Sequence, residues 1–185
     1  MLLTSKEILQ YIKKKKIVIT PFDESQVRDI AIQLHLGYLF RKPKKKSKVS
    51  KIIGNSKLVV VIDEKTSSDE YYYDKFFDKP IQVTDYFTLK PGELALATTL
   101  EKIKLSDDTV GILDGKSKIA RLGLFIHISS QLIKPGSNNI TVLELYNASP
   151  FIIKLKPGSQ ICQLTLHSTH SKVHYNGAFE RQTKP

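Results

Sequence analysis

Cysteine, methionine and tryptophan are scarce in this chain of 185 residues, which has one cysteine, one methionine and no tryptophan. The single cysteine, Cys162, can form no internal disulfide and cannot build a cysteine-rich zinc site. Zinc-dependent base deaminases are excluded for the same reason, since their metal needs a Pro-Cys-x-x-Cys pair to activate the attacking water. We therefore expect no zinc, and a stability that comes from packing or subunit association.

Long apolar runs are also missing. No stretch approaches the roughly 20 apolar residues that a membrane-spanning helix needs. The opening segment, MLLTSKEILQYIKKKK, places its lysines after its apolar residues, which reverses the order of a secretory signal. We expect a cytoplasmic protein with no membrane partner.

The net charge of +11 resides in two runs, residues 13–16 and residues 41–51, while acidic and basic residues balance over the rest of the chain. Such dense runs repel themselves and usually lie in solvated loops. No aromatic residue that could stack on a base alternates with these lysines. We predict a solvated basic loop at residues 41–57; binding of nucleic acid through it remains an alternative that we do not favour.

The composition, 41% hydrophobic and 25% charged, is that of a globular protein, and the length suits a single domain over residues 1–185. Thr4 and Glu7 have capping-box spacing, which predicts a short helix that ends in the first lysine run. Short apolar runs rich in β-branched and aromatic residues then alternate with turn residues. The expected strands cover residues 17–20, 32–36, 58–62, 94–99, 111–113, 125–129, 140–146, 151–155 and 161–166.

This succession of strands predicts an all-β sandwich or closed barrel with a short N-terminal helix. Residues 117–122 could form one or two helical turns. The tail, residues 168–185, is polar and has no periodicity, so we expect it to be flexible unless something binds it.

Polar residues gather inside one apolar stretch, residues 111–147. Lys116, Ser117 and Arg121 lie within six residues, and Glu144 interrupts an apolar strand. Strand alternation places Glu144 on the same face as Val142. Its carboxylate lies either on a solvated face or in a pocket suited to proton transfer, and the residues alone leave both interpretations open.

Several motifs together resemble the deoxycytidine triphosphate (dCTP) deaminase branch of the deoxyuridine triphosphatase (dUTPase) superfamily. They are LKPGELALATTLE at 89–101, GKSKIARLGL at 115–124, LELYN at 143–147 and LKPGSQICQLTL at 155–166. The resemblance implies a distorted β-barrel assembled as a homotrimer, with nucleotide sites between subunits. It implies hydrolytic deamination of dCTP to deoxyuridine triphosphate (dUTP) and ammonia, with no metal in the chemical step.

The resemblance also implies the site residues. Glu144 would shuttle protons between water and the cytosine, while Ser117 and Arg121 would hold the water and stabilise the developing charge. Magnesium would accompany the triphosphate, and dUTP or dTTP could bind as ligands. The residues implied for substrate binding are Lys116, Lys118, Lys134, Gln163, Tyr175 and Gln182.

Four positions depart from the family's motifs. Lys118 replaces a serine, Lys134 replaces the aspartate that accepts a hydrogen bond from the sugar 3′-hydroxyl, and Gln33 and His35 replace an aspartate and an arginine. These changes leave two alternatives beside the deaminase. One is a dUTP pyrophosphatase, and the other is a catalytically impaired relative that binds nucleotides or regulates.

Overall fold

The computed structural model describes residues 1–44, 72–177 and 180–185. In chain order the elements are α1 (Ser5–Lys13), β1 (Ile17–Thr20), η1 (Glu24–Gln26), β2 (Val27–Arg28), β3 (Ala31–Arg41), η2 (Tyr72–Lys75), β4 (Ile81–Gln82), β5 (Phe87–Leu89), β6 (Leu94–Leu105), β7 (Thr109–Gly115), α4 (Ser117–Ala120), β8 (Leu124–Phe125), β9 (Leu132–Ile133), β10 (Asn138–Asn147), β11 (Ile153–Leu155) and β12 (Gln160–Ser168). The predicted strand at residues 58–62 and most of the predicted basic loop lie outside the described residues.

The N-terminal helix forms as its sequence predicts. The backbone N–H of Thr4 donates to the Glu7 carboxylate over 2.8 Å, which completes the capping box. This hydrogen bond holds the pKa of Glu7 below its usual value. The helix buries Ile8 against the core and ends at Lys13, where the lysine run begins.

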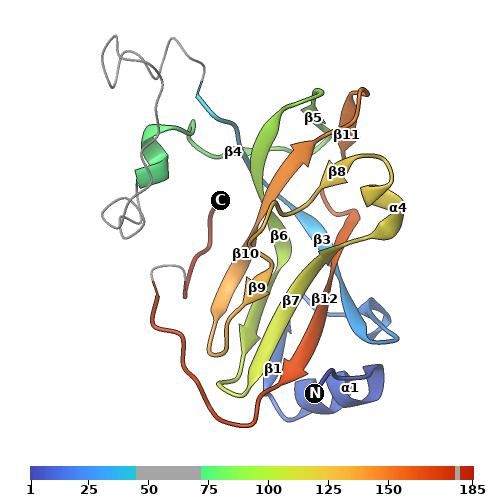
Figure 1. Ribbon diagram of the computed structural model, residues 1–185, viewed down its shortest axis with the longest axis vertical. Helices are drawn as coiled ribbons and strands as arrows, with labels where there is room; N and C mark the ends of the chain where they lie inside the picture. Colours follow the sequence, from blue (N-terminus) through green and yellow to red (C-terminus); the bar gives the residue numbers. More distant parts are fainter. Residues whose placement is uncertain (45–71, 178–179) are drawn as a thin grey trace.

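One ten-stranded antiparallel sheet forms the body of the molecule and curls around its core (Figure 1). Its main path runs β8-β10-β6-β3-β12-β7-β9, so strands from distant parts of the sequence are neighbours. Alternating residues of the central strands fill the interior, and they include Leu34, Leu36, Leu143, Leu145, Leu164 and Leu166, all with no exposed area. A second sheet pairs β5 with β11. The prediction of a mainly β, barrel-like protein with one short N-terminal helix is confirmed.

Two local predictions need correction. The strand expected at residues 125–129 ends at Phe125, because the backbone N–H of Ile128 donates to the Glu144 side chain instead of to a neighbouring strand. Arg41, expected in the basic loop, ends β3 and is only 5% exposed, with its Nε donating to the carbonyl of Asp78.

The C-terminal tail returns to the sheet and lies along β10 in Figure 1. The backbone N–H groups of Asn138 and Ile140 donate to the carbonyls of Glu180 and Gln182. His174 Nδ1 lies 2.7 Å from the Asp107 carboxylate at the turn between β6 and β7. None of the described helices is long and apolar enough to cross a bilayer.

Candidate active site

A cavity of about 390 Å³ opens where the two ends of the curled sheet approach each other. Its walls come mainly from β10, the neighbour of the end strand β8, from β9 at the other end of the sheet path, and from the C-terminal tail. The lining includes Lys134, Thr141, Glu144, Tyr175 and Gln182. The cavity therefore has a mixed polar and apolar lining, to which the tail contributes.

Glu144 is one of the residues that line this cavity. It is half-buried on β10, opposite Leu96 of β6. Its Oε2 accepts a hydrogen bond of 2.9 Å from the backbone N–H of Ile128, and its own N–H donates to the carbonyl of Ile126. One carboxylate oxygen thus accepts from the backbone, while no hydrogen bond to Oε1 is found among the described residues.

Three residues implied for substrate binding gather at the same cavity. Lys134 places its Nζ 4.6 Å from the centre of the Tyr175 ring, a cation–π geometry. Tyr175 is tethered through its N–H to the carbonyl of Pro135, and Gln182 through its carbonyl to Ile140. Lys134 is exposed beside Tyr175, so its ammonium can approach a bound ligand.

The GKSKIAR motif lies elsewhere on the same chain, at α4. Ser117, Lys118 and Arg121 are exposed there, and none of them lines the cavity that contains Glu144. The turn that follows α4 requires Gly123, whose φ of +82° favours glycine and where an added Cβ would lie 2.7 Å from the Cβ of Ser149. One chain alone therefore does not bring Ser117 and Arg121 to Glu144.

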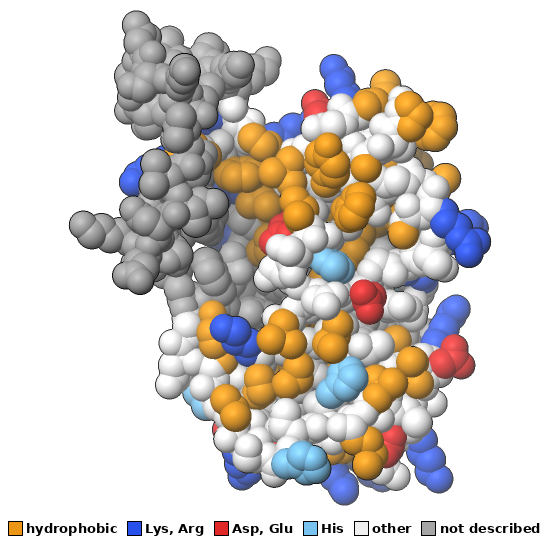
Figure 2. Space-filling view, in the orientation of Figure 1, with side chains coloured by type: hydrophobic (Ala, Val, Ile, Leu, Met, Phe, Trp, Pro, Cys, Tyr) orange, Lys and Arg blue, Asp and Glu red, His pale blue; other side chains and the backbone are white. Residues whose placement is uncertain are grey.

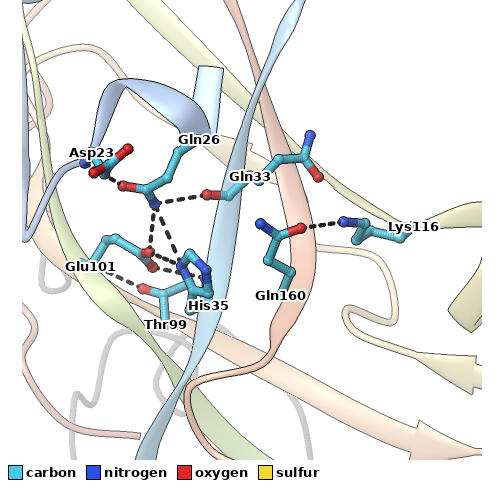
Figure 3. Close-up of polar contacts among 8 residues, drawn as sticks. All are labelled: Asp23, Gln26, Gln33, His35, Thr99, Glu101, Lys116 and Gln160. Atoms are coloured by element: carbon cyan, nitrogen blue, oxygen red, sulfur yellow. Dashed lines mark hydrogen bonds and ion pairs between the residues drawn. The ribbon is translucent and has the colours of Figure 1, made fainter. Parts of the chain in front are cut away.

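Lys116 is held on the sheet beside this motif. Its Nζ donates to Gln160 Oε1 over 2.8 Å, as Figure 3 shows. Burial lowers the pKa of Lys116, and the positive charge of Arg28 lowers it further. Gln163, implied as a substrate-binding residue, pairs with Gln33 on β3 and with Asp114 on β7, so it shares this region of the sheet.

A buried polar cluster that the sequence gave no reason to expect lies on the other side of β3 (Figure 3). Glu101 is 1% exposed, and its carboxylate accepts from the backbone N–H of His35 over 2.9 Å and from the Gln26 amide over 2.9 Å. The His35 Nδ1 lies 2.6 Å from the same carboxylate, within hydrogen-bonding distance. His35, a departure from the family motif, thus serves as the hydrogen-bond partner of a buried acid.

Exposed apolar side chains surround α4 and β8. Leu122, Phe125 and Ile128 are 59%, 51% and 56% exposed. Figure 2 shows hydrophobic side chains gathered over the part of the face where β8 and β10 lie in Figure 1. Such a patch beside polar residues is typical of a protein–protein contact.

The described residues contain no group of three His, Cys, Asp or Glu side chains that could hold a metal ion. The donors around the cavity include a carboxylate, amides and hydroxyls from different elements, with the cation of Lys134 among them. They do not form a cage of the kind that a resident metal ion needs.

Comparisons with known proteins show the family of this chain. The model of the dCTP deaminase-like family matches residues 2–169. The chain belongs to the dCTP deaminase-like family. A dCTP deaminase of Buchnera aphidicola subsp. Schizaphis graminum is 36% identical over 188 residues, which cover 100% of this chain and 93% of the relative. A dUMP-forming dCTP deaminase of Hydrogenobaculum sp. is 35% identical over 89% of this chain and 80% of its own length.

The fold of this dCTP deaminase-like chain is also found in a solved structure. The 2′-deoxycytidine 5′-triphosphate deaminase of Agrobacterium tumefaciens superposes with a TM-score of 0.64 and 19% identity. The superposition covers 92% of this chain and 49% of that one, so this chain spans about half the length of that protein. At this identity the superposition shows the shared fold alone.

Proposed function

We propose that this protein deaminates dCTP to dUTP and ammonia. The observation that carries the proposal is the Glu144 carboxylate, which lines the cavity with one oxygen anchored by the Ile128 N–H. The relatives named above are dCTP deaminases over nearly the whole chain, which supports the same reaction here. A carboxylate in a fixed orientation can take and return a proton without moving.

In the proposed reaction, a water adds to C4 of the cytosine while Glu144 removes one of its protons and passes it to ring nitrogen N3. Glu144 then moves the remaining hydroxyl proton to the amino group, which leaves as ammonia as the C4 carbonyl forms. A water with a pKa of about 15.7 needs a base in direct contact for this addition. Glu144 starts and ends the cycle in the same protonation state.

Ser117 and Arg121 complete the site from a neighbouring subunit in this proposal. Both residues are exposed on α4, and neither lines the cavity of its own chain. In this proposal, a second chain therefore supplies them to the cavity that contains Glu144. The apolar side chains of Leu122 and Phe125 adjoin the motif and would be covered in the assembly. We therefore propose that the chain assembles as the homotrimer that the family resemblance implies. In this assembly, the Ser117 hydroxyl holds the attacking water, and the Arg121 guanidinium stabilises the negative charge that develops as the water adds.

The triphosphate would enter with its magnesium as part of the substrate. A phosphate-bound Mg²⁺ keeps water as its other ligands and needs no protein cage. Lys116, Lys118 and Gln163 would face the phosphates, and Tyr175 and Gln182 of the tail would close the site. We place the reaction in the cytoplasm, where an unpaired cysteine such as Cys162 is the common state.

Lys134 argues against a dUTP pyrophosphatase. The relatives include dUMP-forming enzymes, but at this position the resemblance implies an aspartate that positions the hydrolytic water. An ammonium accepts no hydrogen bond and cannot take that part. We propose dUTP as the final product, with dUTP and dTTP able to occupy the site as ligands. The catalytically impaired alternative is not favoured, because Glu144 retains an oriented carboxylate and His35 satisfies a buried acid.

The test is an assay of dCTP with magnesium, followed by the loss of cytosine absorbance and by ammonia release. We expect turnover by the wild type and a loss of at least about a thousandfold in kcat for Glu144→Gln, which cannot act as a base. Nucleotide binding should persist in the variant. A folded wild-type assembly that binds dCTP without turnover would reject the proposal and support the impaired alternative.

A further inference from the structure

Strand β10 departs from regular alternation where it passes the cavity. Asn139 and Thr141 line the cavity as alternate residues of this strand. Val142 and Glu144 line it too, although Val142 directly follows Thr141. Adjacent residues of a regular strand point to opposite faces, but the pairing of β10 with β6 shifts register between Ile140 and Val142, which marks a β-bulge. The bulge therefore adds Thr141 to the cavity wall that Val142 and Glu144 form.

A buried hydroxyl of the neighbouring strand β6 holds this bulge. The backbone N–H of Thr141 donates to Thr99 Oγ1 over 3.2 Å. Thr99 is 2% exposed, and its hydroxyl in turn donates to the carbonyl of Glu101 over 2.8 Å (Figure 3). The position of Thr141 in the wall is thus set by the packing of β6 against β10.

The side-chain hydroxyl of Thr141 is buried, and it has no hydrogen-bond partner among the described residues. A buried hydroxyl without a partner costs free energy, because it gives up its hydrogen bonds to water and gains none. Most buried hydroxyls are paired, so an unpaired one in a cavity wall points to a contact that forms with a ligand. Both branches of a threonine leave Cβ, so a change of the χ1 rotamer exchanges hydroxyl and methyl and can turn the hydroxyl toward that ligand.

The place of Thr141 along the wall selects the part of the nucleotide that it meets. Glu144 is the last residue of β10 in the cavity lining, and the lining continues through Thr141 to Ser137, whose N–H donates to the carbonyl of Lys134. In the proposed reaction Glu144 contacts N3 and C4 of the cytosine, and the sugar is attached at N1, across the ring from C4. Thr141 precedes Glu144 by three residues, which is about 10 Å along a strand, so the sugar of a base held at Glu144 lies toward Thr141.

We infer that the Thr141 hydroxyl binds the 3′-hydroxyl of the deoxyribose and is a specificity residue of the proposed reaction. The 3′-hydroxyl is the one free hydroxyl of the sugar in dCTP. The Thr141 hydroxyl can accept a hydrogen bond from it, whereas the Lys134 ammonium farther along the wall can only donate. The inference rests on the proposed function, since Glu144 fixes the end of the cavity at which the base lies.

The first experiment compares kcat/KM for dCTP and for its 3′-deoxy analogue, dideoxycytidine triphosphate, in the wild type, Thr141→Val and Thr141→Ser. Thr88→Val, on β5 and outside the cavity lining, is the matched control for loss of one hydroxyl. Thr141→Val should lower kcat/KM for dCTP about tenfold and leave the analogue within about twofold. Thr141→Ser and Thr88→Val should keep the preference of the wild type. An equal loss for both nucleotides, or no loss for dCTP, would overturn the inference.

The second experiment separates this role from a structural one. It measures the Tm of the nucleotide-free proteins at one protein concentration. Thr141→Val removes an unpaired hydroxyl and keeps the shape of the side chain, so its Tm should equal that of the wild type or exceed it by roughly 3 °C. Thr99→Val loses two hydrogen bonds, and its Tm should fall. A lower Tm in Thr141→Val would show that the hydroxyl is already paired in the free protein and would overturn the inference.

The third experiment does not depend on turnover. Calorimetry should show tighter binding of dCTP than of the 3′-deoxy analogue to the wild type, and about equal binding of both to Thr141→Val. Equal binding of both nucleotides to the wild type would overturn the inference. A preference for dCTP that depends on Thr141 in a protein without turnover would reject the proposed reaction and leave the sugar contact standing.

Discussion

The buried acid Glu101 offers a sharp test of how the barrel is held together. In Glu101→Gln, one of the two carboxylate oxygens becomes an NH₂ group. Oε1 accepts from the Gln26 amide and lies 2.6 Å from His35 Nδ1, and Oε2 accepts from the His35 backbone N–H, so at least one donor would face the new NH₂ group. At 1% exposure, no water can replace the lost acceptor.

The cost follows from these contacts. Glu101→Gln leaves one buried donor unpaired and replaces the charged acceptor of the other hydrogen bonds with a neutral one. Together these changes should lower the free energy of unfolding by about 3 kcal/mol. For a domain of this size, that corresponds to a fall in Tm of roughly 10 °C. Glu93→Gln is the control, because Glu93 is half-exposed and its ion pair with Lys42 should contribute about 1 kcal/mol or less.

The assay is thermal unfolding followed by circular dichroism at one protein concentration, since the Tm of an assembly depends on concentration. We expect Glu101→Gln to melt well below Glu93→Gln. If the two variants melted within about 3 °C of each other, the cluster around Glu101 would not be the structural element described above.

Three further predictions concern the tail, the cysteine and the sugar site. The hydrogen bond with Asp107 raises the pKa of His174 from its usual value of 6.5. Docking of the tail should therefore be strongest below pH 6.5 and weaken as the pH rises through the pKa of the folded protein. The rate of tail proteolysis should follow this pH dependence, and His174→Gln should abolish it. Burial raises the pKa of the Cys162 thiol, so a thiol reagent should label nothing in the folded protein and one group per chain after unfolding; rapid labelling of the native state would contradict its position in the core. Lys134→Asp should increase discrimination between dCTP and its 3′-deoxy analogue about tenfold, because a carboxylate accepts a hydrogen bond from the 3′-hydroxyl. Equal kcat/KM ratios in both proteins would argue against Lys134 as the sugar contact.

Much of the fold could be predicted from the sequence because its signals are local. The capping box of Thr4 and Glu7 and the apolar alternation of the long strands act over a few residues. The end of β8 at Phe125 could not be predicted in the same way. It depends on the Glu144 side chain, which lies 16 residues away from Ile128 in the sequence and takes the hydrogen bond of a would-be strand residue.

The candidate site shows the same division. The motifs predicted Glu144, Lys134, Tyr175 and Gln182 as site residues, and these four residues line one cavity. The buried position of Glu101 could not be predicted from the motif at 89–101 that contains it, because its burial arises from the pairing of β3 with β6.

The central claim is that Glu144 acts together with Ser117 and Arg121 of another chain. Mixing subunits tests it most directly. Glu144→Gln and Arg121→Ala assemblies, each inactive alone, are unfolded together in equal amounts and refolded, and dCTP turnover is measured. Shared sites should return activity in about one quarter of the sites, since a site then needs the intact Glu144 of one variant beside the intact Arg121 of the other. No recovery of activity in refolded mixed assemblies would contradict the account.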